Sequence, residues 1–341
     1  MKTRHFKIHS PDSEDIAIVA DILKNGGIAA IPTETVYGLA GNALKGECVK
    51  KIYHAKGRPS DNPLIVHISD ISQWAPLVKS IPETALALAE NFWPGPLTII
   101  LPKSDIIPAE ISGGLDTVAV RMPSDKIARA IISECSFPLA APSANTSGKP
   151  SPTCASHVTE DLDGKIDAIV DSGECSVGIE STVITLATDI PRLLRPGGIT
   201  PEMLTEVLGE IEIDDAVYNK LHEGEKAASP GMKYKHYSPD AKVLIVKGSF
   251  DNYKKYISDS AEEGDVALCF EEEVNDLNIK CITYGRKDDP SSQAKNIFDA
   301  LRKVDEEKAK TVYARFPENE GIGLAVFNRL VRAAAFNIIE V

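Results

Sequence analysis

Cationic and hydroxyl side chains recur beside prolines and glycines at the ends of short apolar runs. Lys56 and Arg58 stand two residues apart in "HAKGRPSDNPLIVH" (54–67), where Pro59 and Pro63 restrict the backbone and an apolar strand follows. Rigid loops on a sheet hold binding groups in place. Lys and Arg pair with the oxygens of phosphate and carboxylate groups. The segment therefore predicts a local site for an anion.

The same pattern returns in further segments. Taken singly, each residue is explained by loop formation or by a solvated surface charge. Together, cations and hydroxyls on proline-fixed loops suit a polyphosphate bound next to a small zwitterion. These residues are Thr33, Glu34 and Thr35 after Pro32; Thr117 and Arg121 on one face of a strand; Ser143 and Asn145 after Pro142; Ser147 and Ser151 around Gly148; Ser181 and Thr182; and Arg195 before Pro196.

Familiar nucleotide and hydrolase signatures are absent from the sequence. "GIGLAV" (321–326) lacks the third glycine of a dinucleotide loop and indicates a helix start, and "TSGKPS" (146–151) has Pro150 where a Walker loop needs Ser or Thr. No G-x-S-x-G elbow, C-x-x-C pair or H-E-x-x-H spacing occurs. His67, on an expected strand, is equally consistent with a ligand contact and with a half-buried structural histidine.

Composition limits the partners of the chain. Its 341 residues carry a net charge of −13, and neither half has an excess of Lys and Arg, so broad electrostatic binding to RNA or to an anionic membrane is not expected. Six scattered cysteines indicate a reduced, cytoplasmic protein. The N-terminus "MKTRHFKIHSPDSED" lacks the apolar core of a signal peptide. No apolar run approaches the roughly 20 residues that span a bilayer.

Hydrophobic periodicity predicts an α/β protein with two domains. In residues 1–205, helices expected near 13–25, 46–54, 83–93 and 125–135 mix irregularly with short strands, which favours a twisted mixed sheet. Residues 206–240 are polar and punctuated by Pro and Gly, as in a linker. In residues 241–341 strands such as "KVLIVKG", "DVALCF" and "KTVYARFP" alternate with helices. This alternation predicts a small, mostly parallel, Rossmann-like domain.

Seven sequence blocks, in order, resemble the YrdC-like family. They are "PTETVYGL", "KGRPSDNPL", "WPGPLT", "VAVRMP", "APSANTSGKPS", "GIESTVI" and "LLRPGGI". The segment "SPGMKYKHYSP" is similar to the linker of the long, two-domain members of that family, the L-threonylcarbamoyladenylate synthases. The resemblance runs from about residue 12 to the C-terminus, and the last domain is matched only by its pattern and placement.

The resemblance implies a reaction in which L-threonine, bicarbonate or CO2, and ATP give threonylcarbamoyl-AMP and pyrophosphate. The nucleophile and the leaving group of this reaction are both anionic, so the site has to supply fixed positive charge and alignment. Lys56 and Arg58 are then the expected catalytic residues, because they would hold carbamate and phosphate oxygens against their mutual repulsion.

Carried over onto this sequence, the resemblance implies two binding subsites. Arg121 leads the threonine subsite, since a planar guanidinium matches the two oxygens of a carboxylate. The threonine residues would be Thr35, His67, Arg121, Ala141 and Ser181; the nucleotide residues would be Arg58, Asn62, Thr117, Ser143, Asn145, Ser151, Arg195, Tyr234 and His236.

The resemblance also implies cofactors and partners. Mg²⁺ is expected to arrive with ATP, since no carboxylate cage is visible, and no organic cofactor is expected; Glu34, the nearest acid, is equally explained as a loop cap. Tyr234 and His236, hinged at Pro230 and Gly231, form a candidate lid that keeps water from a labile product. A separate tRNA threonylcarbamoyl transferase complex would carry the product to the adenosine next to the anticodon, with direct tRNA binding by this chain weak or absent.

Three alternatives are compatible with the same motifs. A carbamoyl-adenylating domain of another pathway, like that of the hydrogenase-maturation carbamoyltransferases, would bring zinc-finger and acylphosphatase-like modules, and no C-x-x-C occurs here. An RNA-binding module of the same fold conflicts with the acidic balance of both halves. A nucleotide-binding regulatory protein would not release pyrophosphate in response to threonine.

Overall fold

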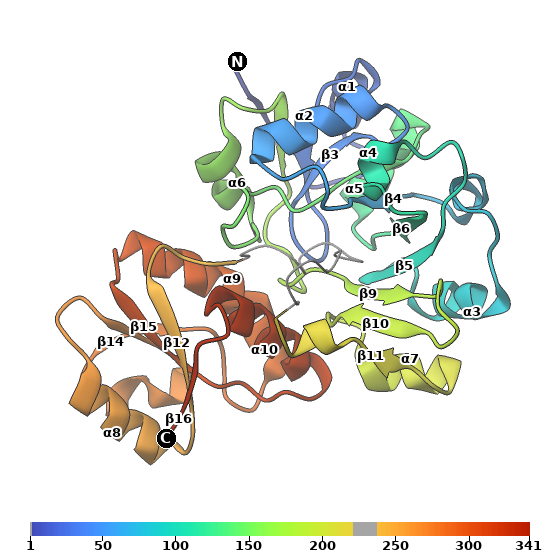
Figure 1. The fold of residues 1–341 in the computed structure, drawn as a ribbon. Helices are drawn as coiled ribbons and strands as arrows, with labels where there is room; N and C mark the ends of the chain where they lie inside the picture. The colour runs from blue at the N-terminus through green and yellow to red at the C-terminus, as the bar shows by residue number, and fades with distance from the viewer. Residues whose placement is uncertain (1, 221–236) are drawn as a thin grey trace.

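The computed structural model describes residues 2–220 and 237–341, and each of these parts is built around a sheet (Figure 1). Within the described residues, the first part forms one eleven-stranded sheet with parallel and antiparallel pairs, and the second forms a five-stranded sheet in which every pair is parallel. The predicted α/β class, with a mixed sheet followed by a small Rossmann-like sheet, is therefore confirmed.

The large sheet draws neighbouring strands from distant parts of the chain. Predicted site residues lie on or next to its middle strands: His67 on β4, Arg121 on β6, Ala141 after β7 and Ser181 before β9. In spatial order the strands are β1 (Arg4–Lys7), β8 (Ala168–Asp171), β2 (Ala29–Ile31), β3 (Gly38–Asn42), β7 (Leu139–Ala140), β4 (Ile65–His67), β6 (Thr117–Arg121), β5 (Leu97–Pro102), β9 (Thr182–Thr185), β10 (Arg192–Arg195) and β11 (Glu212–Ile213).

Helices cover both faces of this sheet, because its inner strands are apolar on both sides. Ala29 and Ile31 belong to the core under α1 and α5, whereas the intervening Ala30 belongs to the core under α2. This alternation is the period of two that a strand imposes on its side chains. The helices of the first part are α1 (Asp15–Lys24), α2 (Gly46–Lys56), α3 (Glu83–Phe92), α4 (Ala109–Ser112), α5 (Lys126–Cys135), α6 (Ala155–Leu162) and α7 (Pro201–Leu208).

Two expectations about local structure differ from the structure. Lys56 is the last residue of α2 rather than a loop residue, and Gly57 ends that helix with a φ of 60°, in the left-handed region that glycine adopts without strain. The expected end of the first domain at residue 205 falls inside α7, and β11 pairs with β10, so the first sheet extends to residue 213. The candidate lid residues Tyr234 and His236, with their hinge at Pro230 and Gly231, lie outside the described residues.

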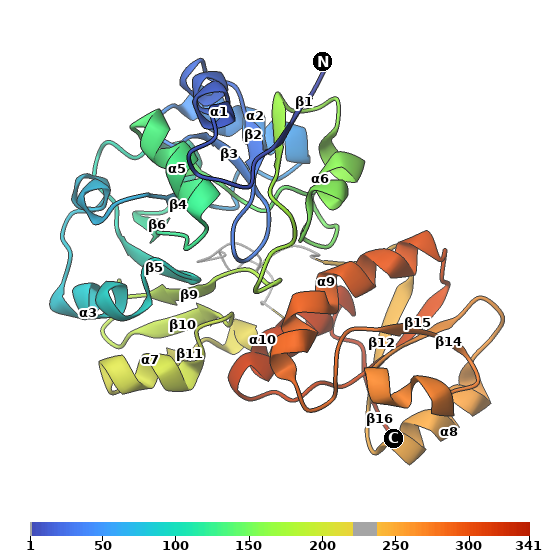
Figure 2. The same ribbon diagram turned by 180° about the vertical axis from the view of Figure 1, so that it is seen from behind.

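The C-terminal sheet has the strand order β14-β13-β15-β12-β16, which requires a crossover between each parallel pair. Helices α9 and α10 lie on the side of this sheet that faces the first domain, as both views show (Figures 1 and 2). The elements are β12 (Lys242–Lys247), α8 (Phe250–Ser260), β13 (Val266–Cys269), β14 (Lys280–Thr283), α9 (Pro290–Glu306), β15 (Thr311–Arg315), α10 (Gly321–Ala333) and β16 (Ile338–Glu340).

The carboxyl end of the parallel strands, where Rossmann-like sheets bind ligands, is filled by side chains. Arg315, the last residue of β15, donates from Nε to both carboxylate oxygens of Glu273 at 2.9 and 3.1 Å. Its guanidinium also lies 4.9 Å from the ring centre of Tyr253. This end of the C-terminal sheet is therefore a packed ion pair rather than a nucleotide crevice.

No helix within residues 2–220 and 237–341 combines the length and the apolar composition that crossing a membrane requires.

Candidate active site

A hollow with about 720 Å³ of space lies on the first domain, where loops from distant segments meet. The hollow is lined by Thr33, Thr35, Val36, Gly38, Lys56, Arg58, Ile65, His67, Arg121, Ala141, Pro142, Ser143, Asn145, Ser147, Gly148, Lys149, Ser151, Glu180, Ser181, Arg195 and Tyr237. Eleven of the residues predicted from the sequence thus meet in one place: Thr35, Lys56, Arg58, His67, Arg121, Ala141, Ser143, Asn145, Ser151, Ser181 and Arg195.

Lys56 reaches from the end of α2 to the loop that follows β7. Its buried Nζ donates to the backbone carbonyl of Ser143, to that of Asn145 at 2.7 Å and to Oδ1 of Asn145 at 3.4 Å. Burial, and then the charge of Arg58, lower the pKa of the Lys56 ammonium well below its usual value. Three oxygen acceptors around one Nζ match the three N–H bonds of an ammonium. Lys56 thus fixes the loop that carries Ser143 and Asn145.

Arg58 lies just beyond the left-handed Gly57, so its side chain turns into the hollow. Its Nη2 donates to the carbonyl oxygen of Pro63 at 3.1 Å and to that of Asn62 at 3.4 Å. Burial lowers the pKa of Arg58 to about 10, which leaves the guanidinium charged at neutral pH. Arg58 therefore supplies a fixed positive charge at the wall of the hollow.

Arg121, at the end of β6, joins a buried ion pair. Its Nη2 lies 2.7 Å from Oε1 of Glu34, and its Nη1 donates to Oγ1 of Thr35 at 2.9 Å. Burial opposes ionisation of Glu34, but attraction to Arg121 and the hydrogen bond from Ser124 N outweigh it, so the pKa of that carboxyl lies below its usual value. Glu34 is thus the counter-ion that orients Arg121, in addition to bonding the backbone of a loop.

His67 faces the hollow from the end of β4. Its ring Nδ1 lies 3.3 Å from the carbonyl oxygen of Ile65, which places the proton on Nδ1 and leaves Nε2 as an acceptor. Burial, and then the charge of Arg121, lower the pKa of His67 to about 3. The imidazole is therefore neutral near pH 7 and can accept a hydrogen bond from a ligand N–H or O–H.

Another wall of the hollow contains Ser181, which comes just before β9, and Arg195, the last residue of β10. Arg195 donates from Nε to the carbonyl of Ser181 at 3.0 Å and from Nη2 to its hydroxyl at 3.2 Å. Oγ of Ser181 also lies 2.7 Å from Oγ1 of Thr98. Burial lowers the pKa of Arg195 to about 10. This wall therefore carries a second charged guanidinium with its position fixed.

The loop from 143 to 151 supplies hydroxyl and amide groups. Ser143 donates to Oδ1 of Asn145 at 2.6 Å, and Nδ2 of Asn145 donates to the carbonyls of Thr146 and Lys149 at 2.8 and 2.9 Å. Ser151 donates to Oε1 of Glu180 at 2.5 Å. Asn145 is therefore the centre of the loop's own hydrogen bonds.

Two predicted nucleotide residues do not line the hollow. Asn62 is buried, and its Oδ1 has no hydrogen-bond partner among the described residues. Thr117, the first residue of β6, lines a smaller and mostly apolar cavity with Pro63 and Leu64. The Arg58 guanidinium contacts the carbonyl of Asn62 and that of Pro63, which lines the smaller cavity with Thr117.

Sequence reasoning missed three polar residues of the hollow. Glu180 lies inside the block "GIESTVI". It was not selected, because a site expected to bind anions does not predict an acidic side chain. Lys149 was set aside with the failed Walker motif. Tyr237 lies at the end of the linker, is buried, and packs on Phe298 with ring centres 5.0 Å apart. Only the folded chain reveals that the end of the linker returns to the hollow.

The carboxylate that lines the hollow, Glu180, and its neighbour Glu34 are already engaged by cations. Glu34 is paired with Arg121, and Glu180 with Arg329, whose Nε lies 2.7 Å from Oε2. No group of three or more His, Cys, Asp or Glu side chains in the described parts of the chain is arranged to hold a metal ion.

A mixed sheet with an arginine-rich hollow, followed by a parallel Rossmann-like sheet, defines the class of α/β proteins that contain a YrdC-type domain. Escherichia coli YciO shares the fold of the first part, with a TM-score of 0.51 and 22% identity over 58% of this chain and 96% of that one. A family model described as "Telomere recombination" matches residues 21–197, and one described as "Threonylcarbamoyl-AMP synthase, C-terminal domain" matches residues 199–335.

Full-length relatives narrow this class. The threonylcarbamoyl-AMP synthase of Pyrococcus abyssi is 47% identical over 96% of both chains, and that of Bacillus subtilis is 46% identical over 100% of both. The crystal structure of P. abyssi Sua5 complexed with L-threonine superposes with a TM-score of 0.92, at 46% identity and over 100% of both chains. The chain belongs to the threonylcarbamoyl-AMP synthase family, in its two-domain form.

Proposed function

We propose that this protein forms threonylcarbamoyl-AMP and pyrophosphate from L-threonine, bicarbonate or CO2, and ATP, acting as a nucleotidyltransferase for threonylcarbamoyl modification of tRNA. The observation that carries the proposal is the convergence of Lys56, Arg58, Arg121 and Arg195 on one hollow. An acidic chain that gathers four cations around one space is built to bring anions together. Membership of the threonylcarbamoyl-AMP synthase family supports the same reaction.

L-Threonine binds at the Arg121 end of the hollow. The guanidinium is held by Glu34 on one side and takes the threonine carboxylate on the other. The neutral His67 accepts a hydrogen bond at Nε2 from the amine or the hydroxyl of the substrate. Thr35 and Ser181 contribute hydroxyls, and Ala141 leaves room for the substrate side chain. A relative solved with L-threonine supports this choice of amino acid.

The reaction needs alignment of anions more than it needs acid–base groups. The threonine amine attacks the carbon of CO2 and loses a proton, or attacks the carbon of bicarbonate with release of water; either route gives a carbamate. A carbamate oxygen then attacks the α-phosphorus of ATP while the bond from that phosphorus to the bridging oxygen breaks, so pyrophosphate leaves with its electron pair. Arg58 and the loop fixed by Lys56 hold the two anions in line, in a site where fixed positive charge stabilises the developing negative charge.

The nucleotide runs from the centre of the hollow past Arg58. Arg58 and Arg195 bind its phosphate oxygens, with Ser143 and Asn145 alongside. Ser151 directs its hydrogen to Glu180 and presents lone pairs to the ligand. Asn62 and Thr117 lie beyond Arg58, where the unpartnered Oδ1 of Asn62 and the apolar cavity suit an amino-bearing base. Tyr234 and His236 remain lid candidates.

Mg²⁺ would be held by the phosphate oxygens of ATP, because Glu180 of the hollow and Glu34 beside it are paired with arginines. When bound, it neutralises charge on the leaving pyrophosphate. The protein needs no organic cofactor. These assignments leave Arg58 and Arg195 as the charges that this chain itself supplies to the nucleotide.

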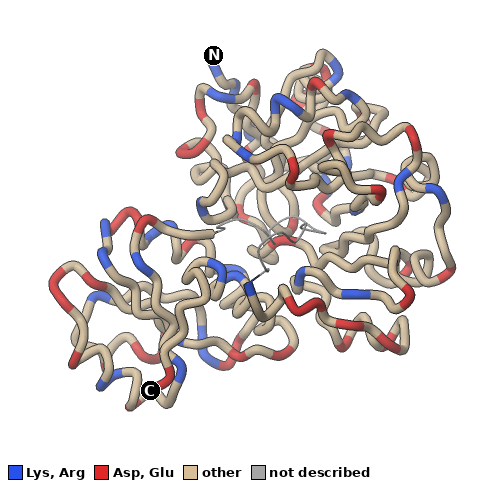
Figure 3. The backbone as a smooth tube through the Cα atoms, viewed as in Figure 1, with Lys and Arg blue, Asp and Glu red and all other residues tan. Residues whose placement is uncertain are grey.

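The product passes to a separate tRNA threonylcarbamoyl transferase complex in the cytoplasm. Lys and Arg are interspersed with Asp and Glu over both domains (Figure 3), which does not favour direct binding of tRNA. Incubation with ¹³C-bicarbonate, threonine and ATP tests the proposal. Mass spectrometry is expected to find threonylcarbamoyl-AMP with one heavy carbon. A product that forms from carbamoyl phosphate without threonine would instead identify the carbamoyl-adenylating alternative.

A further inference from the structure

We propose that the C-terminal domain positions the nucleotide-binding wall of the hollow, through Arg302 of α9 and Arg329 of α10. The inference rests on the proposed function, because it assigns these two arginines to the ATP subsite. Each of them crosses the boundary between the domains and ends on a different part of that wall. Neither would touch the substrate, so both are positioning residues.

Arg329 orients Glu180 and, through it, Ser151. Nε of Arg329 lies 2.7 Å from Oε2 of Glu180, and Oε1 of the same carboxylate accepts the Ser151 hydroxyl at 2.5 Å. All three side chains are buried. Burial opposes ionisation of Glu180, but the charges of Arg329 and Arg195 outweigh it, so the pKa of that carboxyl lies below its usual value. Without Arg329, the carboxylate that directs the Ser151 hydroxyl would lose its partner from the C-terminal domain.

Arg302 holds the turn from 146 to 150, the other part of the wall, through two contacts of one of its nitrogen atoms. Its Nη2 donates to the carbonyl oxygen of Pro150 at 2.7 Å and to Oδ2 of Asp161 at 2.8 Å. Asp161 is completely buried and in turn accepts from Thr146 N at 3.3 Å and lies 3.4 Å from Nζ of Lys149. Arg302 therefore fixes both ends of the turn from 146 to 150.

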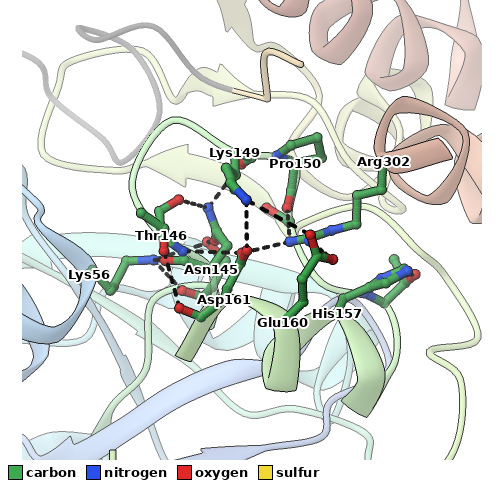
Figure 4. A network of polar contacts seen from close by, with 12 residues as sticks. Lys56, Asn145, Thr146, Lys149, Pro150, His157, Glu160, Asp161 and Arg302 are labelled. Atoms are coloured by element: carbon green, nitrogen blue, oxygen red, sulfur yellow. Dashed lines mark hydrogen bonds and ion pairs between the residues drawn. The ribbon is translucent and has the colours of Figure 1, made fainter. Parts of the chain in front are cut away.

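That turn continues directly to Lys56. Nδ2 of Asn145 donates to the carbonyls of Thr146 and Lys149, and the carbonyl of Asn145 accepts from Lys56. Figure 4 shows this line of contacts from Lys56 through Asn145 and Asp161 to Arg302. A displacement of α9 would thus be passed to Asn145 by hydrogen bonds alone.

Docking of the two domains does not itself require these ion pairs. Val36, Ile179 and Val217 of the first part belong to the same apolar core as Phe298 of α9 and Val326 of α10. Buried ion pairs are no more stabilising than well-packed apolar side chains, because both charges lose water. The ion pairs of Arg302 and Arg329 end on two different parts of the wall that binds the nucleotide. This placement indicates that they position the wall, rather than hold the two domains together.

Gly178 brings α9 close to the loop before β9, which carries Glu180 and Ser181. It has a φ of +81°, and a Cβ there would lie 2.4 Å from Cα of Lys295. Backbone contact of this closeness leaves little freedom for α9 to shift. The arginines are consequently presented from a rigid support.

Binding of α,β-methylene-ATP, followed by calorimetry, tests the proposal in the full-length protein. Arg302→Met and Arg329→Met are each expected to raise the dissociation constant about tenfold, the size of an ordinary coupling between sites. Arg302→Lys should recover part of the affinity, since an ammonium keeps the charge. Arg286→Met is the matched control, because Arg286 is exposed and pairs within the C-terminal domain; its effect should stay within about twofold.

Affinities within twofold of wild type for both folded variants would overturn the inference, even if the protein makes threonylcarbamoyl-AMP. If Arg302→Met does not fold, Asp161→Asn removes the charge that Arg302 meets; a tenfold weaker affinity is expected again, and an unchanged affinity would again overturn the inference. Wild-type protein that binds the analogue but releases no pyrophosphate would overturn the proposed reaction and leave the positioning role standing. Wild-type protein that does not bind the analogue would overturn both.

Discussion

The Nζ atom of Lys56 lies 2.7 Å from the backbone carbonyl oxygen of Asn145, a residue 89 positions later in the chain. This contact joins the end of α2 to the loop after β7 and closes one side of the hollow. It also changes the expected role of Lys56. The ammonium is held by carbonyl oxygens of this loop, so its charge acts at the hollow from a fixed position.

Lys56→Met is expected to lower threonine-dependent pyrophosphate release by about 10²–10³-fold, because a positioned charge is lost and two buried carbonyls lose their donor. Steady-state release of pyrophosphate measures this effect, with circular dichroism to confirm the fold. Lys50→Met, an exposed position on the same helix, should stay within about twofold. Equal rates for the two variants would remove Lys56 from the mechanism.

Arg121→Lys is expected to raise the KM for threonine much more than the KM for ATP. A lysine keeps a charge beside Glu34 but cannot offer two parallel donors, so the KM for threonine should rise about 10–100-fold. The KM for ATP should change by no more than about twofold. Titration of each substrate at saturation of the other gives both values. A larger effect on ATP than on threonine would place the carboxylate elsewhere.

Asn62→Ala and Thr117→Val should show the reverse pattern, with a larger effect on the KM for ATP than on the KM for threonine. Both positions lie beyond Arg58, on the side assigned to the nucleoside, so each variant is expected to raise the KM for ATP about tenfold through loss of one hydrogen bond. The KM for threonine should not move. An unchanged KM for ATP in both variants would show that the adenine base does not extend beyond Arg58.

The pH dependence of His67 follows from its burial. Its pKa in the folded protein is about 3, whereas an unfolded histidine titrates near 6.5. The unfolded chain therefore gains a proton first as the pH falls, and the folded state loses stability from about pH 6.5 downward toward pH 3. Histidine NMR resonances should show no titration of His67 between pH 5 and 8. Urea unfolding at pH 7 and pH 4.5 should show a smaller loss in His67→Gln than in the wild type. A His67 midpoint near 6.5 contradicts the assigned neutral ring.

Local sequence signals predict much of the fold. The helix expected at 13–25 is α1, the apolar strand expected after Pro63 is β4, and the alternation after residue 241 is an all-parallel sheet. Helix α7 was missed although its signal is present: Thr200 caps it, accepting from Met203 N at 3.4 Å, and Pro201 begins it.

The contacts between the domains were not predictable in this way. Arg302 and Asp161 are separated by 141 positions, and Arg329 and Glu180 by 149. Each looks like an ordinary helix or loop residue in its local sequence. Only tertiary packing shows that these charges are buried and paired. Most of the residues selected beside prolines and glycines did meet in one hollow, because rigid loops at strand ends gather at one edge of a sheet; Asn62 and Thr117 did not.

Release of pyrophosphate by the wild-type protein tests the central claim most directly, when threonine, bicarbonate and ATP are omitted one at a time. The arrangement of Lys56, Arg58, Arg121 and Arg195 predicts one pyrophosphate for each threonylcarbamoyl-AMP formed, and none above background when any one substrate is missing. Pyrophosphate that appears at the same rate without threonine would contradict the claim that this hollow aligns a threonine carbamate with ATP.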